Sequence, residues 1–249
     1  MSPTPSVDAG LRRFIGFALA PNERGFCGPA DHALLRDHLR DGSGGTELAR
    51  LARAFSGPLP YLQVIADAAG IADPFAPQVV GAYWLGGDLL DAVDPQVCAA
   101  ALLTAFAGQP TVDPRRIEAT RDAAVPSHAY HVLVTYPWID LVAAGRPQAL
   151  QPLDDCRVRW GEVVAVADDA VEVSVQPLEV SEGRLALGAA RVDLVRPVQR
   201  PDAPSLAVGD VVALHWDHLC DRLTAAEVRE LATRTAAVMA VVNDRLLGG

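Results

Sequence analysis

The sequence predicts an α+β protein in which an N-terminal α-helical domain is followed by a small β-barrel and a C-terminal helix. Apolar residues recur at helical spacing through the first 125 residues. Short β-branched runs separated by turns then fill residues 158–214, which is typical of a small barrel. A capped periodic segment covers residues 224–247. We therefore predict a helical domain over residues 1–150 and a barrel with its helix over residues 151–249.

The composition excludes several classes of function. The chain has 249 residues, half of them hydrophobic, which is enough for a sizeable core. Its formal charge is -10 with no block of like charges, which argues against a nucleic-acid partner, because such a partner requires a basic face. All 21 basic residues are arginine, which excludes a catalytic, Schiff-base or P-loop lysine. A dinucleotide site has no support either, because the sequence contains no G-x-G-x-x-G stretch.

Cysteine usage and hydropathy predict a cytoplasmic protein. The four cysteines are widely spaced and form no C-x-x-C pair, so we expect free thiols in a reducing compartment. The segment from Arg12 to Ala20 faintly resembles a twin-arginine signal, but its apolar part is short and Pro21 follows it. We predict a short buried strand or helix there. No apolar run approaches the roughly 18 residues needed to span a membrane.

The helical domain is expected to follow a disordered start over residues 1–10. A turn-rich loop is predicted over residues 20–29. Residues 128–138 are rich in aromatic and β-branched side chains, and they predict either a strand or a buried helix ended by Pro137. Residues 145–152 are predicted to be a linker. Between these segments, helices are predicted over residues 31–40, 46–56, from Pro60, over 77–93 and 96–106, and near Pro114.

The barrel strands are predicted from short apolar runs, and one of them leads into a group of possible metal ligands. The runs cover residues 158–166, 170–175, 191–195 and 211–214. The last run ends at His215, and His218 and Cys220 follow within five residues. Thr224 and Glu227 then form a capping box that starts the final helix. Soft ligands gathered between a strand end and a helix make this stretch the best candidate for chemistry.

Two motifs resemble the HypC family, small chaperones of nickel–iron hydrogenase maturation. The first is Cys156-Arg-Val-Arg-Trp-Gly161 with the valine-rich run after it, which is similar to the opening of that family. The second is Val208-Gly-Asp-Val-Val-Ala-Leu-His215, followed by Asp-Arg-Leu223 and the capped helix. The order and spacing of both motifs agree with the family over roughly residues 154–240.

This resemblance implies an OB-like barrel and an accessory role in hydrogenase maturation. It implies that Cys156 and His215 hold an iron bearing carbonyl and cyanide ligands while the iron passes to its partners. These partners would be hydrogenase maturation proteins or the hydrogenase large subunit. A thiolate and a neutral imidazole are compatible donors for such an iron.

The sequence also departs from the family in several places. Cys156 is internal, whereas the family's cysteine lies near the chain start, and Trp160 stands where the family has a proline. The residues from Trp216 to Cys220 replace an apolar segment. The helical N-terminal domain is not part of the small chaperone.

Further candidate ligands keep other interpretations open. His218 and Cys220 would extend the cluster if the local chain is a helical turn, or belong to a polar loop. His128 and His131 have the spacing of a metal-binding pair on one helix face, or of structural histidines in an aromatic core. Cys27 lies at a predicted helix N-terminus, or in a tight turn with a buried thiol.

Two alternatives to the accessory role therefore stay open. One is a metalloenzyme that reuses the barrel, with a site for iron or another metal between the two domains. The other is a metal-free interaction module in which only the fold has been retained.

Overall fold

The structure is a computed structural model that describes residues 7–167 and 169–247. Its helical elements, in chain order, are α1 (Val7–Glu23), α2 (His32–Asp41), α3 (Gly45–Arg53), α4 (Leu59–Ala68), α5 (Pro77–Leu85), η1 (Asp88–Leu90), α6 (Pro95–Ala105), α7 (Pro114–Ala119), η2 (Arg121–Ala123), α8 (His128–Tyr130), η3 (His131–Thr135), α9 (Trp138–Ala143), η4 (Pro147–Ala149), α10 (Leu150–Cys156) and α11 (Ala225–Arg245). Its strands are β1 (Arg159–Val166), β2 (Val171–Val175), β3 (Leu178–Ser181), β4 (Arg184–Leu187), β5 (Arg191–Pro197), β6 (Val211–His215) and β7 (His218–Arg222).

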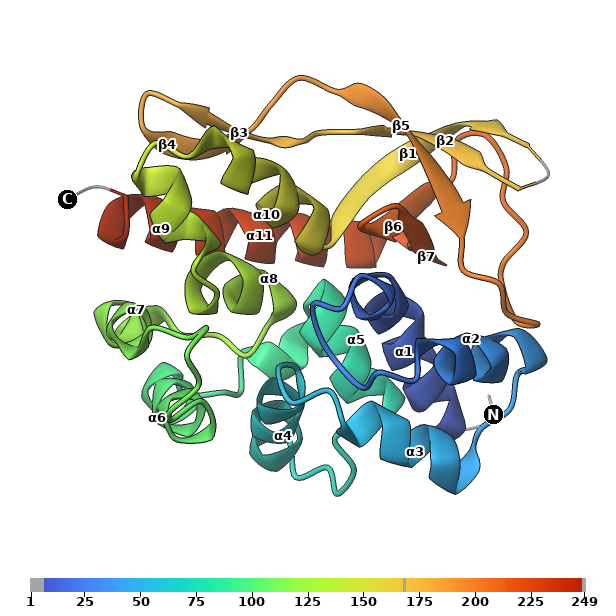
Figure 1. The fold of residues 1–249 in the computed structure, drawn as a ribbon, viewed down its shortest axis with the longest axis horizontal. Coiled ribbons are helices and arrows are strands. Elements are labelled where there is room, and N and C mark those ends of the chain that lie inside the picture. Colours follow the sequence, from blue (N-terminus) through green and yellow to red (C-terminus); the bar gives the residue numbers. More distant parts are fainter. Residues whose placement is uncertain (1–6, 168, 248–249) are drawn as a thin grey trace.

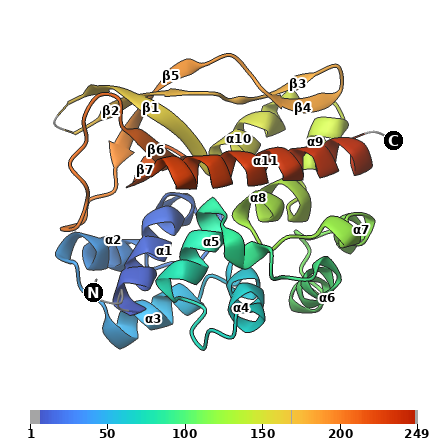
Figure 2. The same cartoon turned by 180° about the vertical axis from the view of Figure 1, so that it is seen from behind.

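The elements form layers. Helices α1 to α7 lie on one side of the molecule, and the strands lie on the other (Figure 1). Helix α11 runs between them in contact with α5, α8 and β4, and the reverse view shows the same arrangement (Figure 2). The predicted order, with N-terminal helices before a small barrel and a helix at the C-terminus, is confirmed. The larger apolar cluster contains residues of both the helical part and the barrel, so the two share a continuous core.

Helix α1 is the centre of the helical part. Phe14, Ile15 and Phe17 are fully buried in it, and the helix packs against α2, α3 and α5 as well as β6 and β7. Of the two alternatives predicted for Arg12–Ala20, a buried strand or a buried helix, the structure has the buried helix. The helix continues through Pro21 to Glu23, so the loop predicted from residue 20 begins later. Residues 7–10 also belong to α1, and the rest of the predicted disordered start lies outside the described residues.

The barrel closes in the order β1-β2-β5-β7-β6. Its neighbouring strands are antiparallel except for the parallel pair β5 and β7. Alternation along β6 places Val212 and Leu214 in the barrel interior. Ala213 packs instead in the larger cluster that the barrel shares with the helices. Strand alternation places His215 on the same helix-facing side, and this orientation sets the position of its imidazole.

Two predicted elements were wrong. The helix predicted over 77–93 ends at Leu85, because Gly86 and Gly87 adopt positive φ angles of 92° and 139° that a helix cannot continue through. The predicted linker 145–152 contains η4 and the start of α10, whose Leu153 is buried.

At residues 215–220, where a helical turn and a polar loop were both open, the chain forms a hairpin. His215 pairs with His218 across a two-residue turn, and Cys220 lies in β7. The hairpin β3–β4 was not predicted.

Two alternatives were open for residues 128–138. The chain is helical from His128 to Thr135, and this helical segment ends before Pro137. The predicted capping box of α11 is present, with reciprocal bonds between Thr224 and Glu227. Within the described residues, no helix is both long and apolar enough to cross a membrane.

Two glycines of α1 provide a matched test of this packing. A Cβ atom at Gly10 would lie 1.9 Å from the carbonyl oxygen of Phe75, whereas a Cβ at Gly16 would meet nothing closer than an Arg200 nitrogen at 3.6 Å. We expect Gly10→Ala to lower the free energy of unfolding by roughly 2–3 kcal/mol, because the backbones must separate. Gly16→Ala should raise it by up to about 1 kcal/mol through helix propensity. Denaturant unfolding followed by circular dichroism measures both; equal effects would contradict the close approach of α1 to the loop before α5.

Candidate metal centre

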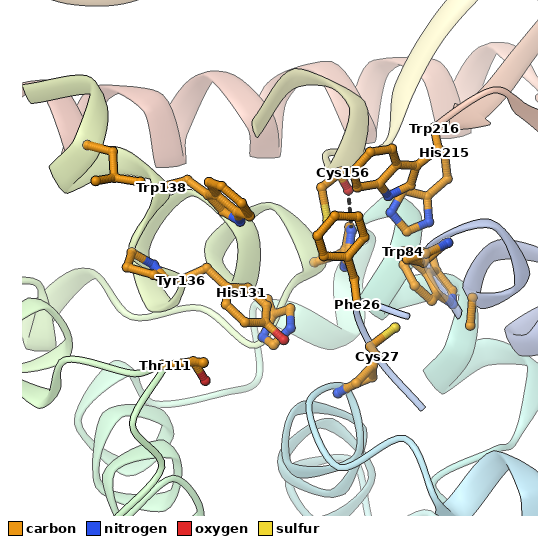
Figure 3. Close-up of a pocket in the computed structure, with 16 residues that line it drawn as sticks. Phe26, Cys27, Trp84, Thr111, His131, Tyr136, Trp138, Cys156, His215 and Trp216 are labelled. Carbon is orange, nitrogen blue, oxygen red and sulfur yellow. Dashed lines mark hydrogen bonds between the residues drawn. The ribbon is translucent and has the colours of Figure 1, made fainter. Parts of the chain in front are cut away.

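A cavity of about 380 Å³ lies at the junction of the helical part and the barrel. Its walls are mostly apolar and aromatic, and its polar side-chain groups are three imidazoles, two thiols, two hydroxyls and three indole N–H groups. The lining residues are Ala18, Pro21, Phe26, Cys27, Pro58, Trp84, Thr111, His128, His131, Tyr136, Pro137, Trp138, Leu141, Cys156, His215 and Trp216. Figure 3 shows this cavity with its lining side chains.

Three possible ligands converge at one end of the cavity. One nitrogen each of His128 and His215 and the sulfur of Cys156 all lie within 4.8 Å of one another. The residues come from the start of α8, the end of α10 and the end of β6. Both histidines are buried, and Cys156 is partly exposed to the cavity. We call these three residues the triad.

A proline in α1 determines how His215 is oriented. Pro21 has no backbone N–H, so the carbonyl of Phe17, four residues earlier, lacks its helical donor. The Nδ1–H of His215 donates to this carbonyl over 2.7 Å. The Nε2 atom of His215 is therefore the unprotonated nitrogen, and it is buried with no hydrogen-bond partner. Metal-binding histidines commonly donate their other ring N–H to a backbone carbonyl in this manner.

His128 is held by a different pattern. Its Nε2–H donates to the carbonyl of Cys156 over 2.7 Å, the dashed line of Figure 3. Its Nδ1 then accepts from the hydroxyl of Tyr83 at 3.2 Å. The lone pair on Nδ1 is the one left for a metal, and using it requires the Tyr83 hydroxyl to turn away.

Burial keeps the triad uncharged. Desolvation lowers the pKa of His215 to about 4, although the carbonyls of Phe17 and Cys156 oppose this. Desolvation and the two neighbouring imidazoles hold the pKa of His128 well below its usual value. Burial raises the pKa of the Cys156 thiol, with the indole of Trp216 opposing. The imidazoles are thus ready to donate lone pairs at neutral pH, while the thiol must lose a proton before it binds a metal.

A strained turn places Trp216 at the cavity. Trp216 is the first residue of the β6–β7 turn, and its φ of 58° is a conformation that favours glycine. Two bonds hold it there: its N–H donates to the carbonyl of Asp155 at 2.7 Å, and its carbonyl accepts from Arg159 at 2.6 Å. Such strain tends to persist at functional sites, where the surrounding structure maintains it.

The remaining sequence candidates separate into two groups. Cys27 and His131 line the same cavity, although neither belongs to the triad. Burial raises the pKa of Cys27 to about 12 and lowers that of His131 to about 3. The structure places His218 and Cys220 away from the cavity. His218 lies near the carboxylates of Glu23 and Asp217, and the Cys220 side chain packs in the core.

The triad fits a transition metal. Two imidazoles and one thiolate are ligands that iron and zinc accept, and the triad contains no carboxylate, which magnesium and calcium prefer. The most direct evidence for a metal site is the Nε2 atom of His215, which is buried and makes no hydrogen bond, so its lone pair is available to a metal ion.

Three contributors to this site were missed at the sequence level. They are Pro21, Tyr83 and Trp216. A proline late in an apolar helix is visible in the sequence, and it indicates a free carbonyl four residues earlier. The sequence contains no signal that identifies His215 as the donor to that carbonyl. The hydroxyl contact of Tyr83 with His128 depends on tertiary packing, which the sequence does not reveal.

The tautomers of the two triad histidines are testable. We expect His215 to carry its proton on Nδ1 and His128 on Nε2, and neither ring to titrate between pH 5 and 8. Long-range 15N–1H correlation spectra report both properties. In Pro21→Ala, a new N–H at position 21 competes for the Phe17 carbonyl, so a population of His215 protonated on Nε2 should appear. A wild-type His215 that titrates near its ordinary pKa of about 6.5 would contradict this arrangement.

Comparison with known proteins identifies a family. A family model described as a family of unknown function (DUF6390) matches residues 6–248. No curated protein and no solved structure matches the chain. Since the matched segment covers nearly its whole length, the chain belongs to the DUF6390 family.

Proposed function

We propose that this protein is a metal-binding accessory protein that acts like a HypC chaperone and holds an iron species during assembly of the nickel–iron hydrogenase site. One observation carries the proposal. Cys156 and His215, the two residues that match the chaperone's ligands, are brought together at the end of one cavity. They lie far apart in the sequence, so their convergence is a property of the fold.

The fold and the chemistry of the site support this proposal. The closed five-stranded barrel supports its OB-like part. Free cysteines, among them Cys156, agree with a reducing cytoplasm. A thiolate with neutral imidazoles suits iron, and apolar walls suit small uncharged ligands such as carbon monoxide on that iron. The proposed partners are hydrogenase maturation proteins or the hydrogenase large subunit.

A second candidate is a metalloenzyme that reuses the barrel. The favouring observation is the space beside the triad, where His131 and Cys27 face a cavity large enough for a small substrate. Here the triad would hold a metal permanently, and the remaining cavity would take the reactant. The third interpretation, a metal-free interaction module, would be favoured by protein that contains no metal but forms a stable complex in pull-downs.

Removal of the triad thiol separates these functions. We expect Cys156→Ala to abolish iron retention by protein purified without oxygen, measured as iron per chain by elemental analysis. The matched control is Cys220→Ala, because Cys220 is a buried thiol in β7 that lies outside the triad. The control should retain iron.

The same measurement on histidine variants completes the test. Iron content unchanged in Cys156→Ala would refute the carrier role. Metal lost in His128→Ala or His131→Ala, but kept in Cys156→Ala, would favour the enzyme instead.

Metal affinity should rise with pH in a defined way. Because burial raises the pKa of Cys156, the thiol is protonated throughout pH 6–8, and binding must release its proton. The imidazoles are already neutral in this range because their pKa values are depressed. We expect the association constant for Co²⁺ to increase about tenfold per pH unit, the slope for one released proton.

Competition with a chromophoric chelator, corrected for the chelator's own protonation, gives this slope. The Cys156→Ala variant should show a slope near zero, and it should lack the thiolate-to-cobalt charge-transfer band. A wild-type slope near zero would show that the thiol is not a ligand.

A further inference from the structure

The cavity extends well beyond the triad. Figure 3 shows Thr111, Tyr136 and Trp138 on one side of it and Cys156, His215 and Trp84 on the other. The volume of about 380 Å³ is within the range of sites that enclose small molecules. A metal at the triad would occupy only one end of this space.

The lining carries no formal charge at neutral pH. Among the described residues that line the cavity, none is an aspartate, glutamate or arginine. The thiol of Cys27 and the hydroxyl of Tyr136 are neutral because burial raises the pKa of each. His131 is also neutral, because burial lowers its pKa to about 3. A charged guest would lose its hydration without finding a counter-ion, which disfavours it strongly.

Four buried nitrogens of the lining residues lack a hydrogen-bond partner: His215 Nε2, the indole nitrogens of Trp84 and Trp216, and His131 Nδ1. His131 Nδ1 is buried and makes no hydrogen bond. The ring is fixed edge-on between Tyr61 and Tyr136, with centroids 4.9 and 4.7 Å away. An unpartnered buried nitrogen on a fixed ring is costly unless a further group bonds to it.

The rim of the cavity is aromatic and exposed. Phe26 is 49% exposed and stacks on Trp216 with ring centroids 4.9 Å apart, while its edge faces Trp138. Leu141 is 42% exposed at the same cavity. Large apolar side chains at a mouth that opens on an apolar interior favour the entry of an apolar guest.

We infer that this cavity binds a neutral, flat small molecule that carries one hydrogen-bonding group. The ring system lies among Phe26, Tyr136 and Trp138, and the polar group bonds to His131. This binding does not depend on a metal at the triad, so it stands apart from the function proposed above.

A matched pair of probes tests the inference. 2-Naphthol and 2-naphthoate share one ring system, but only the second is an anion at pH 7. Isothermal titration calorimetry with the full chain should show saturable one-to-one binding of 2-naphthol, and binding of 2-naphthoate at least about tenfold weaker. The iron content of the same sample is measured in parallel, so that failure of the metal proposal is seen separately.

A variant of His131 tests the polar contact. His131→Phe keeps an aromatic ring in place but removes both nitrogens, so the affinity for 2-naphthol should fall roughly fivefold, while that for naphthalene stays unchanged. Trp160→Phe, at a tryptophan outside the cavity lining, is the control and should bind as the wild type does. Circular dichroism confirms that each variant is folded.

Three results would overturn the inference. They are no binding of 2-naphthol or naphthalene by the wild type, equal binding of the anion, or an unchanged affinity of His131→Phe for 2-naphthol.

Discussion

The candidate site depends on one missing hydrogen bond in α1. Pro21 leaves the Phe17 carbonyl without a helical donor, in the interior where an unpaired carbonyl is costly. His215 at the end of β6 supplies the donor from across the junction. One contact therefore satisfies the helix, attaches the barrel to the helical part and leaves the Nε2 lone pair of His215 free. The same hydrogen bond therefore stabilises the fold and orients the imidazole so that its Nε2 can bind a ligand.

The rest of the triad is also positioned by hydrogen bonds between different helices. The Cys156 carbonyl, at the end of α10, accepts from His128, so one residue positions a neighbouring imidazole with its backbone and offers a sulfur with its side chain. Tyr83 from α5 completes the bonding of His128. The site is thus assembled by helices α1, α5, α8 and α10 together with strand β6. It exists only when the helical part and the barrel are packed together.

The sequence predicts the order of helices, barrel and final helix because these depend on local periodicity and capping. Every member of the triad is among the candidate ligands of the sequence: His128 through its spacing from His131, and Cys156 and His215 through what the resemblance to the HypC family implies. The sequence did not show which of the candidate ligands lie together in the fold. His218 and Cys220 are adjacent to His215 in sequence, yet the β6–β7 hairpin turns them away, whereas His128 comes from a distant helix. Proximity in the fold depends on long-range packing, which neither periodicity nor spacing encodes. The helical turns at 147–156 were missed for lack of a strong local signal. The Gly86–Gly87 pair is itself a visible signal for the end of a helix, and the prediction of a helix through residue 93 did not follow it.

An enclosed cysteine changes how a carrier would exchange its cargo. In the resembled family the cysteine is near the chain start and can enter a partner's cleft, whereas Cys156 lies inside a cavity whose rim is formed by Phe26 and Trp216. Exchange would therefore require this rim to open. Trp216 already holds a positive φ angle, stabilised by bonds to Asp155 and Arg159. Strain of this kind costs on the order of 1–3 kcal/mol, so a turn that releases it on opening recovers part of the cost of separating the stacked rings. In the proposed carrier role, the turn after His215 is therefore a place where access to the triad would be controlled.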